Sequence, residues 1–155
     1  MKFTIRRMDE ADVPAVHEID RLSFTLPWPE RSFRFEVTGN PAARCWVAEV
    51  EGRVAGMIVV WMIVDEAHVA TIATHPDFRR QGIGEELLTH ALLSAIAEGA
   101  VKSLLEVRAS NTVAQAMYRR FGYVEDGIRP RYYNDNHEDA LLMSLDLGAF
   151  RGGRP

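Results

Sequence analysis

The stretch Arg79-Arg-Gln-Gly-Ile-Gly-Glu85 combines two arginines with two closely spaced glycines. It follows a predicted strand that ends before Pro76, and it leads into a strongly amphipathic helix. The first turn of a helix has unpaired backbone N–H groups and a positive dipole end. Gly82 and Gly84 would let a phosphate approach those groups closely, and arginines would add charge. Residues 80–85 are therefore predicted to bind a pyrophosphate, although a basic turn entering a core helix would have the same sequence.

Two common phosphate-binding patterns do not fit this stretch. The P-loop requires Gly-Lys-Ser/Thr, and no lysine follows these glycines. The dinucleotide pattern requires three spaced glycines and an acidic residue about 20 positions further on. The Arg79–Gly84 segment, after a strand that ends in x-Pro-x-Phe, instead resembles the acyl-CoA-binding signature Q/R-x-x-G-x-G/A of the GNAT superfamily of N-acetyltransferases. That resemblance implies that the pyrophosphate of acetyl-CoA lies on this helix start.

The elements predicted from periodicity support the same fold. An α/β (α+β) domain is expected, with a mixed, mostly antiparallel sheet of about seven strands, flanking helices, and two central parallel strands that splay around acetyl-CoA. Strands are predicted at residues 2–7, 44–50, 54–64, 68–74, 103–108, 123–129 and 139–146, and helices at about 13–22, 29–37, 82–98 and 111–121. The domain is expected to cover residues 1–147, and residues 148–155 to form a flexible tail.

Composition limits the possible functions. The chain has 155 residues, 47% of them hydrophobic, which suits one globular domain. A formal net charge of −4 argues against a dedicated nucleic-acid binder. No apolar run reaches the roughly 20 residues that span a membrane, and the start is a predicted strand and not a signal peptide. A cytoplasmic protein is expected. Its histidines and single cysteine lack metal-ligand spacing, so no metal is expected.

Glu106 lies in Leu104-Leu-Glu-Val-Arg108, a predicted strand. An amine that attacks a thioester must lose a proton, because the pKa of an α-amino group is roughly 7.7–8.0. A carboxylate beside the acyl site could accept that proton directly or through a water molecule. The alternative is an exposed strand glutamate that forms a cross-strand pair with an arginine.

Three further residues also allow two interpretations. Tyr118 is a general acid for a departing thiolate or a core tyrosine with a satisfied hydroxyl. Asn111, on nearly the same helix face, is a helix N-cap or a ligand of the pantetheine amide. Cys45 lies in an apolar strand, which favours a buried structural thiol over an acetyl carrier. His75 is assigned to the turn near the pyrophosphate and not to the base.

Several longer segments resemble the ribosomal-protein-alanine N-acetyltransferases within the superfamily. They are Leu105–Asn111, Ala116–Tyr118, Phe121–Tyr123, Ile128–Tyr133, Glu138–Ala140 and Phe24-x-x-Pro-Trp28, and the resemblance covers about Thr4 to Leu147. It implies that Glu106 is the proton acceptor and Tyr118 the proton donor. The implied acetyl-CoA site comprises Ile72, Ala73, Thr74, Arg79, Arg80, Gln81, Gly82, Ile83, Gly84, Glu85 and Asn111. Thr74 and His75 depart from the Val and Asp that are usual in the family.

The expected activity is N-α-acetylation of a protein, with a ribosomal protein among the candidates. A short extended peptide end would bind between two segments rich in aromatic residues. The residues assigned to it are Phe24, Trp28, Arg131, Tyr132 and Tyr133, although Trp28 could equally staple two helices and the tyrosines could be packing residues. The alternatives are acetylation of a small-molecule amine and a non-catalytic acyl-CoA-binding module. A monomer or weak dimer without nucleic-acid or membrane partners is expected.

Overall fold

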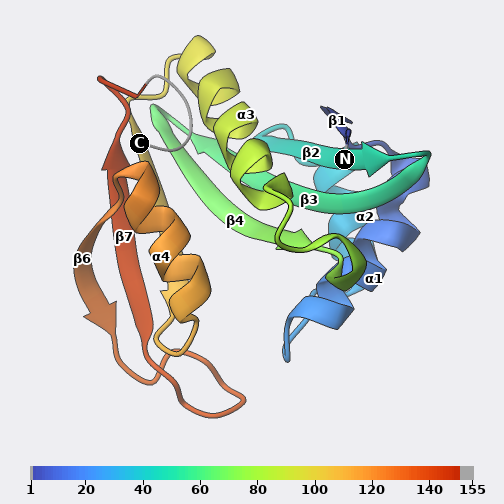
Figure 1. Ribbon diagram of the computed structural model, residues 1–155. Helices are drawn as coiled ribbons and strands as arrows, with labels where there is room; N and C mark the ends of the chain where they lie inside the picture. The colour runs from blue at the N-terminus through green and yellow to red at the C-terminus, as the bar shows by residue number, and fades with distance from the viewer. Residues whose placement is uncertain (1, 151–155) are drawn as a thin grey trace.

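The computed structural model describes residues 2–150, which form a single seven-stranded sheet flanked by helices (Figure 1). The strands are β1 (Thr4–Arg7), β2 (Ala43–Val50), β3 (Arg53–Ile63), β4 (Glu66–Thr74), β5 (Lys102–Arg108), β6 (Val124–Arg129) and β7 (Ala140–Asp146). The helices are α1 (Val13–Ser23), α2 (Glu30–Thr38), α3 (Ile83–Ala97) and α4 (Thr112–Phe121), with short 3-10 helices η1 (Glu10–Asp12) and η2 (Pro76–Phe78). This is the predicted order of elements, and the predicted fold class is confirmed.

The sheet has the order β1-β2-β3-β4-β5-β7-β6. Strands β1 to β4 form an antiparallel meander, and β5 follows through the α3 crossover, parallel to β4. The β4–β5 register contains three pairs, and the last of them joins His68 to Leu104. Beyond these two residues the strands diverge, so a wedge opens in the middle of the sheet.

A β-bulge in β4 lies at the start of this wedge. Val59 of β3 faces Thr71, whereas the next residue, Val60, faces Val69, so Ala70 is extra in the β4 strand. A bulge bends its strand and strengthens the local twist. The bend therefore occurs where β4 turns away from β5.

Two apolar cores lie on opposite faces of the sheet. Helices α1 and α2 cover one face, and α3 and α4 cover the other (Figure 1). Phe33 and Ile19 are fully buried in the first core. Leu87 and Leu92 of α3 are fully buried in the second core. None of the helices in residues 2–150 combines the length and apolar character needed to cross a membrane.

Gly56 sets how closely α3 approaches the sheet. A Cβ atom at this position would lie 2.9 Å from Cγ2 of Ile83 and 3.1 Å from Cδ1 of Leu87. Both residues belong to the first turns of α3. The absence of a side chain on β3 therefore allows the start of α3 to pack directly against the strand.

The predicted flexible tail is wrong for its first residues. Phe150 is only 9% exposed, and its ring stacks on Phe121 of α4 at a centroid distance of 6.1 Å. A backbone bond from the Phe150 N–H to the carbonyl of Leu147 folds the chain back at this point. Burial of one aromatic ring thus extends the ordered fold to residue 150, and residues 151–155 lie outside the described part of the chain.

Gly56→Ala is expected to lower the free energy of unfolding by about 1–3 kcal/mol, the usual cost of overpacking a core. The measurement is urea unfolding. Gly127→Ala is the matched control, because Gly127 also lies in a strand and a Cβ there would meet no atom within 4 Å. The control should change stability by less than about 0.5 kcal/mol. Equal stability of the two variants would contradict close packing at Gly56.

Candidate active site

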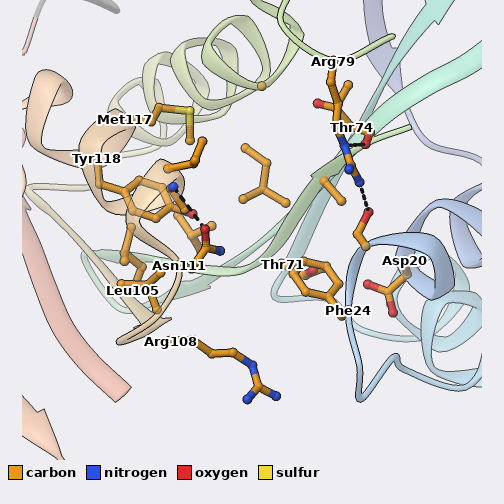
Figure 2. A pocket seen from close by; sticks show the side chains of 18 of the residues that line it. Asp20, Phe24, Thr71, Thr74, Arg79, Leu105, Arg108, Asn111, Met117 and Tyr118 are labelled. Carbon is orange, nitrogen blue, oxygen red and sulfur yellow. Dashed lines mark hydrogen bonds between the residues drawn. The ribbon is translucent and has the colours of Figure 1, made fainter. Parts of the chain in front are cut away.

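A cleft of about 810 Å³ fills the wedge between β4 and β5. Its walls come from the end of α1 and the loop after it, from β4, from the start of α3, from β5, and from α4 (Figure 2). The chain thus brings distant segments to one cavity, at the point where the two parallel strands lose their mutual hydrogen bonds. An edge of unpaired strand backbone can accept an extended ligand.

The predicted pyrophosphate site forms one end of the cleft. Arg80 and Gly82 both have positive φ angles, of 64° and 80°, which reverse the chain before α3. The Glu86 N–H donates to the Gly82 carbonyl at 3.0 Å, so Gly82 begins the hydrogen bonding of α3 and the backbone N–H groups of its first turn lie at the start of the helix. A Cβ at Gly84 would lie 3.7 Å from Oγ1 of Thr74 and 3.8 Å from Sδ of Met117. These are ordinary contacts, so packing does not require glycine there, and its effect is to leave room in the cleft.

The residues predicted to bind the cofactor lie around this end, with one exception. Those that line the cleft are Ile72, Ala73, Thr74, Arg79, Arg80, Gly82, Ile83, Gly84, Glu85 and Asn111, whereas Gln81 is not part of its wall. Arg79 is already engaged, because its Nε donates to the Thr74 carbonyl at 3.0 Å and its Nη2 donates to Oγ of Ser23 at 3.2 Å (Figure 2). Its guanidinium therefore also ties α1 to the end of β4.

Asn111 serves as a helix cap and also faces the cleft. Its Oδ1 accepts the N–H of Ala114 at 3.2 Å, which caps α4 (Figure 2). The cap interpretation is confirmed, and it leaves the amide nitrogen at the cleft wall. His75 caps η2 in a similar way, because its Nδ1 accepts the N–H of Asp77 at 3.1 Å. The imidazole thus belongs to the turn, as the sequence indicates.

Glu106 lines the cleft and also forms an ion pair. Its neighbours Leu105 and Val107 are buried against α3 and α4, and all three residues contribute to the cleft wall. Its carboxylate lies 3.2 Å from Nη2 of Arg129 on β6, and the Glu106 side chain is 33% exposed. The pairing with an arginine is therefore confirmed, and the same carboxylate lines the cleft, whereas its role as proton acceptor stays a prediction.

Tyr118 lies in the cleft wall on α4, only 5% exposed. Its ring meets Tyr123 edge to face at a centroid distance of 5.6 Å. Burial raises the pKa of the Tyr118 hydroxyl, so the phenol keeps its proton at neutral pH. A protonated hydroxyl facing a cleft can donate a hydrogen bond or a proton.

The residues assigned to the peptide divide into two groups. Phe24, Trp28 and Tyr133 line the cleft. Trp28 also stacks on Trp61 at 6.2 Å, so it staples α2 to the sheet as well. Arg131 and Tyr132, in contrast, are exposed turn residues outside the cleft wall, and the guanidinium of Arg129 lies 4.8 Å from the Tyr132 ring.

Several polar residues of the cleft were not predicted, among them Asp20 and Arg108. Asp20 of α1 is 1% exposed, and its Oδ2 accepts the Trp28 N–H at 2.8 Å. Burial raises the pKa of this carboxyl group. The sequence did contain a signal for Asp20. This residue follows Ile19 and lies four residues after Val16, so its carboxylate borders the buried face of the helix. Arg108 also lines the cleft, two residues beyond Glu106 and so on the same face of β5.

Other reactive groups lie elsewhere. Cys45 is buried, and its burial, followed by the nearby Glu36, raises the pKa of its thiol to about 12. The prediction of an inert structural thiol is confirmed. Within residues 2–150 no three His, Cys, Asp or Glu side chains are grouped so as to hold a metal ion.

Comparisons with known proteins agree with this geometry. The model of the acetyltransferase (GNAT) family matches residues 13–123. The Bacillus subtilis (strain 168) candidate for ribosomal protein bS18-alanine N-acetyltransferase is 42% identical over 94% of this chain and 97% of its own length. The Escherichia coli (strain K12) ribosomal protein bS18-alanine N-acetyltransferase is 34% identical over 93% of this chain and 97% of its own length.

A solved structure extends this similarity to the fold. The crystal structure of the ribosomal-protein-S18-alanine N-acetyltransferase from Escherichia coli superposes with a TM-score of 0.87 and 33% identity, over 94% of both chains. Motif, fold and overall sequence thus lead to one conclusion. The chain belongs to the acetyltransferase (GNAT) family.

Proposed function

We propose that the chain is an N-α-acetyltransferase that moves the acetyl group of acetyl-CoA to the free N-terminal amine of a protein. One observation carries the proposal: Glu106 from β5 and Tyr118 from α4 line the same cleft. The start of α3 and the aromatic loop that holds Phe24 and Trp28 line the same cleft. A candidate proton acceptor and a candidate proton donor therefore share one cavity with a phosphate site and a site suited to a peptide end.

The residues present fit acetyl-CoA. The backbone N–H groups and positive dipole at the start of α3 suit a pyrophosphate, and Gly84 leaves the room that a side chain would fill. The β4 edge beyond His68 offers backbone groups to an extended pantetheine arm. The residues that would hold the cofactor are Ile72, Ala73, Thr74, Arg79, Arg80, Gly82, Ile83, Gly84, Glu85 and Asn111. Bound acetyl-CoA would supply an activated acyl carbonyl.

The chain's own residues would then move the protons. Glu106 accepts a proton from the incoming amine, directly or through a water molecule. The new C–N bond forms as the C–S bond breaks, and the Tyr118 hydroxyl supplies a proton to the departing sulfur. Backbone N–H groups along β4 polarise the carbonyl oxygen. Each step uses one group of the cleft, and none requires a metal ion.

A protein N-terminus is the best-supported acceptor. The relatives from Bacillus subtilis and Escherichia coli are named for acetylation of the alanine end of ribosomal protein bS18. The aromatic lining provided by Phe24, Trp28 and Tyr133 suits a short extended chain. We therefore infer a similar substrate here, with the reaction in the cytoplasm, where such chain ends and acetyl-CoA meet.

The direct test is acetylation of short peptides that differ only in their first residue, read by mass. Polyamines serve as the competing acceptors. We expect turnover of peptides with small first residues and no turnover of polyamines. Turnover of polyamines alone would show a small-molecule enzyme. Calorimetric binding of CoA without turnover of any amine would show a non-catalytic binding module.

Glu106→Gln is expected to lower peptide turnover at least about 100-fold, because general acid–base catalysis typically contributes about 10²–10⁴-fold. The affinity for CoA, measured by calorimetry, should stay unchanged. Glu125→Gln is the matched control, because Glu125 is also a strand glutamate paired with an arginine, Arg119, at 3.7 Å. Normal turnover of the Glu106 variant between about pH 7 and pH 9 would remove this residue from the mechanism.

Tyr118→Phe is expected to slow acyl transfer about tenfold, measured in a single turnover. The effect should be smaller than that of Glu106→Gln, because a thiol pKa near ~8.5 makes the thiolate a tolerable leaving group without help. Tyr123→Phe is the matched control, since Tyr123 is also a buried tyrosine and its hydroxyl lies 2.7 Å from Oγ of Ser103. That control should lose about 1 kcal/mol of stability but keep its rate. A wild-type rate in Tyr118→Phe would leave this residue with a packing role alone.

A further inference from the structure

The open end of the β4–β5 wedge is bridged by side chains. Thr25 lies in the loop between α1 and α2, residues 24–29, and Asp135 lies in the loop between β6 and β7, residues 130–139. The Thr25 hydroxyl donates to Oδ2 of Asp135 across 110 positions of sequence. The two sides of the cleft are therefore joined by strand pairing at the closed end and by this contact at the other.

Arg108 is the centre of this bridge. Its Nη1 and Nη2 lie 3.0 Å and 2.9 Å from the two carboxylate oxygens of Asp135, which is a bidentate pair. Nη1 also lies 3.3 Å from Oε1 of Glu138, and Nη2 donates to Oγ1 of Thr25 at 3.4 Å. The guanidinium carbon lies 4.0 Å from the centroid of the Tyr133 ring. These five residues, Thr25, Arg108, Tyr133, Asp135 and Glu138, are called the Arg108 cluster below.

The cluster is shielded enough to hold a defined geometry. The side chains of Arg108, Asp135 and Glu138 are 20%, 21% and 13% exposed. The hydrogen bonds from Arg108 and then Thr25 lower the pKa of Asp135 to about 2, so this carboxylate stays charged at any working pH. Glu138 also accepts the N–H of Ser110, which ties the same loop to the turn before α4.

The loop that the cluster holds has little structure of its own. Residues 130–139 contain no helix or strand up to Asp139, and Arg131 and His137 adopt positive φ angles of 52° and 56°. Such angles are unfavourable for residues other than glycine, so the surrounding contacts must fix the loop. The fixed loop places the Tyr133 ring in the cleft wall, across from Phe24 and Trp28.

We propose that Arg108 is a positioning residue for the acceptor peptide, because it sets the separation between the loop of residues 24–29 and the loop of residues 130–139. This inference rests on the function proposed above. Glu106 and Arg108 share one face of β5, so a single strand carries the proton acceptor and the anchor of the peptide-binding loops. The position of the incoming amine relative to Glu106 is then fixed by the same strand that holds the carboxylate.

The test uses Arg108→Gln in the full chain. We expect the KM for a peptide acceptor to rise about tenfold, while the KM for acetyl-CoA changes less than about twofold, because none of the five residues of the cluster belongs to the proposed cofactor site. Arg108→Lys, which keeps the charge but loses the fork of donors, should lie between the wild type and Arg108→Gln. Asp135→Asn should raise the same KM, and its effect should not add to that of Arg108→Gln.

A second readout does not depend on turnover. Arg131 is the one trypsin site within residues 130–139, and Arg129 is protected because Pro130 follows it. Cleavage after Arg131 should become several-fold faster in Arg108→Gln as the loop loses its anchor. Arg6→Gln is the matched control, because Arg6 also bridges two carboxylates, Asp12 at 2.8 Å and Glu49 at 2.9 Å, on β1 outside the cleft. This control should leave the peptide KM and the cleavage rate after Arg131 unchanged.

Three results would overturn the inference. They are a wild-type peptide KM in Arg108→Gln, a parallel rise of the KM for both substrates, and faster trypsin cleavage at every site, which would show a general loss of stability. Failure of the proposed function is distinguishable, because the wild-type chain itself would then acetylate no peptide. In that case the peptide role of Arg108 also fails, while trypsin still decides whether it anchors the loop.

Discussion

The structure depends on the loss of hydrogen bonding between two neighbouring strands. β4 and β5 pair from Glu66–Lys102 to His68–Leu104 and then separate. Paired backbone groups stabilise a sheet, and unpaired ones within a protein must find another partner. The wedge therefore leaves the inner edges of both strands ready for an extended ligand. The cleft forms because the hydrogen bonding between β4 and β5 stops at this point. The diverging strands then set the positions of the side chains that they contribute to the cleft wall.

The wedge is held open by contacts on all its sides. The bulge at Ala70 bends β4 away, and Gly56 lets the start of α3 sit against the sheet behind it. Arg120 of α4 reaches Glu85 of α3 at 2.8 Å, which joins the two helices that flank the opening. The Arg108 cluster joins the two loops at the other face. Both bridges are polar, and between them the wedge keeps a cleft of about 810 Å³.

Local patterns predicted the fold, and they placed all but one of the proposed cofactor residues in the wall of the cleft. The glycines and the helix start lie within seven consecutive residues, so sequence spacing alone placed them. The peptide end depends on contacts between residues 25, 108 and 135, and no local pattern reports a bond across 110 positions. For the same reason Arg131 and Tyr132 were assigned to a cleft that they do not line. Phe150 was assigned to a flexible tail because glycines flank it in the sequence. Its ring packs on Phe121 of α4, a contact that the local sequence does not indicate.

The two interpretations of Glu106 are compatible on physical grounds. Arg129 is 52% exposed, and an ion pair in contact with solvent is weak, typically about 0.2–1 kcal/mol. Exchanging that arginine for the proton of an amine or a water molecule therefore costs little. The pair also has a structural effect, since it holds the carboxylate on the side of β5 that faces the cleft. The ion pair with Arg129 can thus keep the proposed proton acceptor oriented without blocking it, so the structural role and the proposed chemical role of Glu106 are not exclusive.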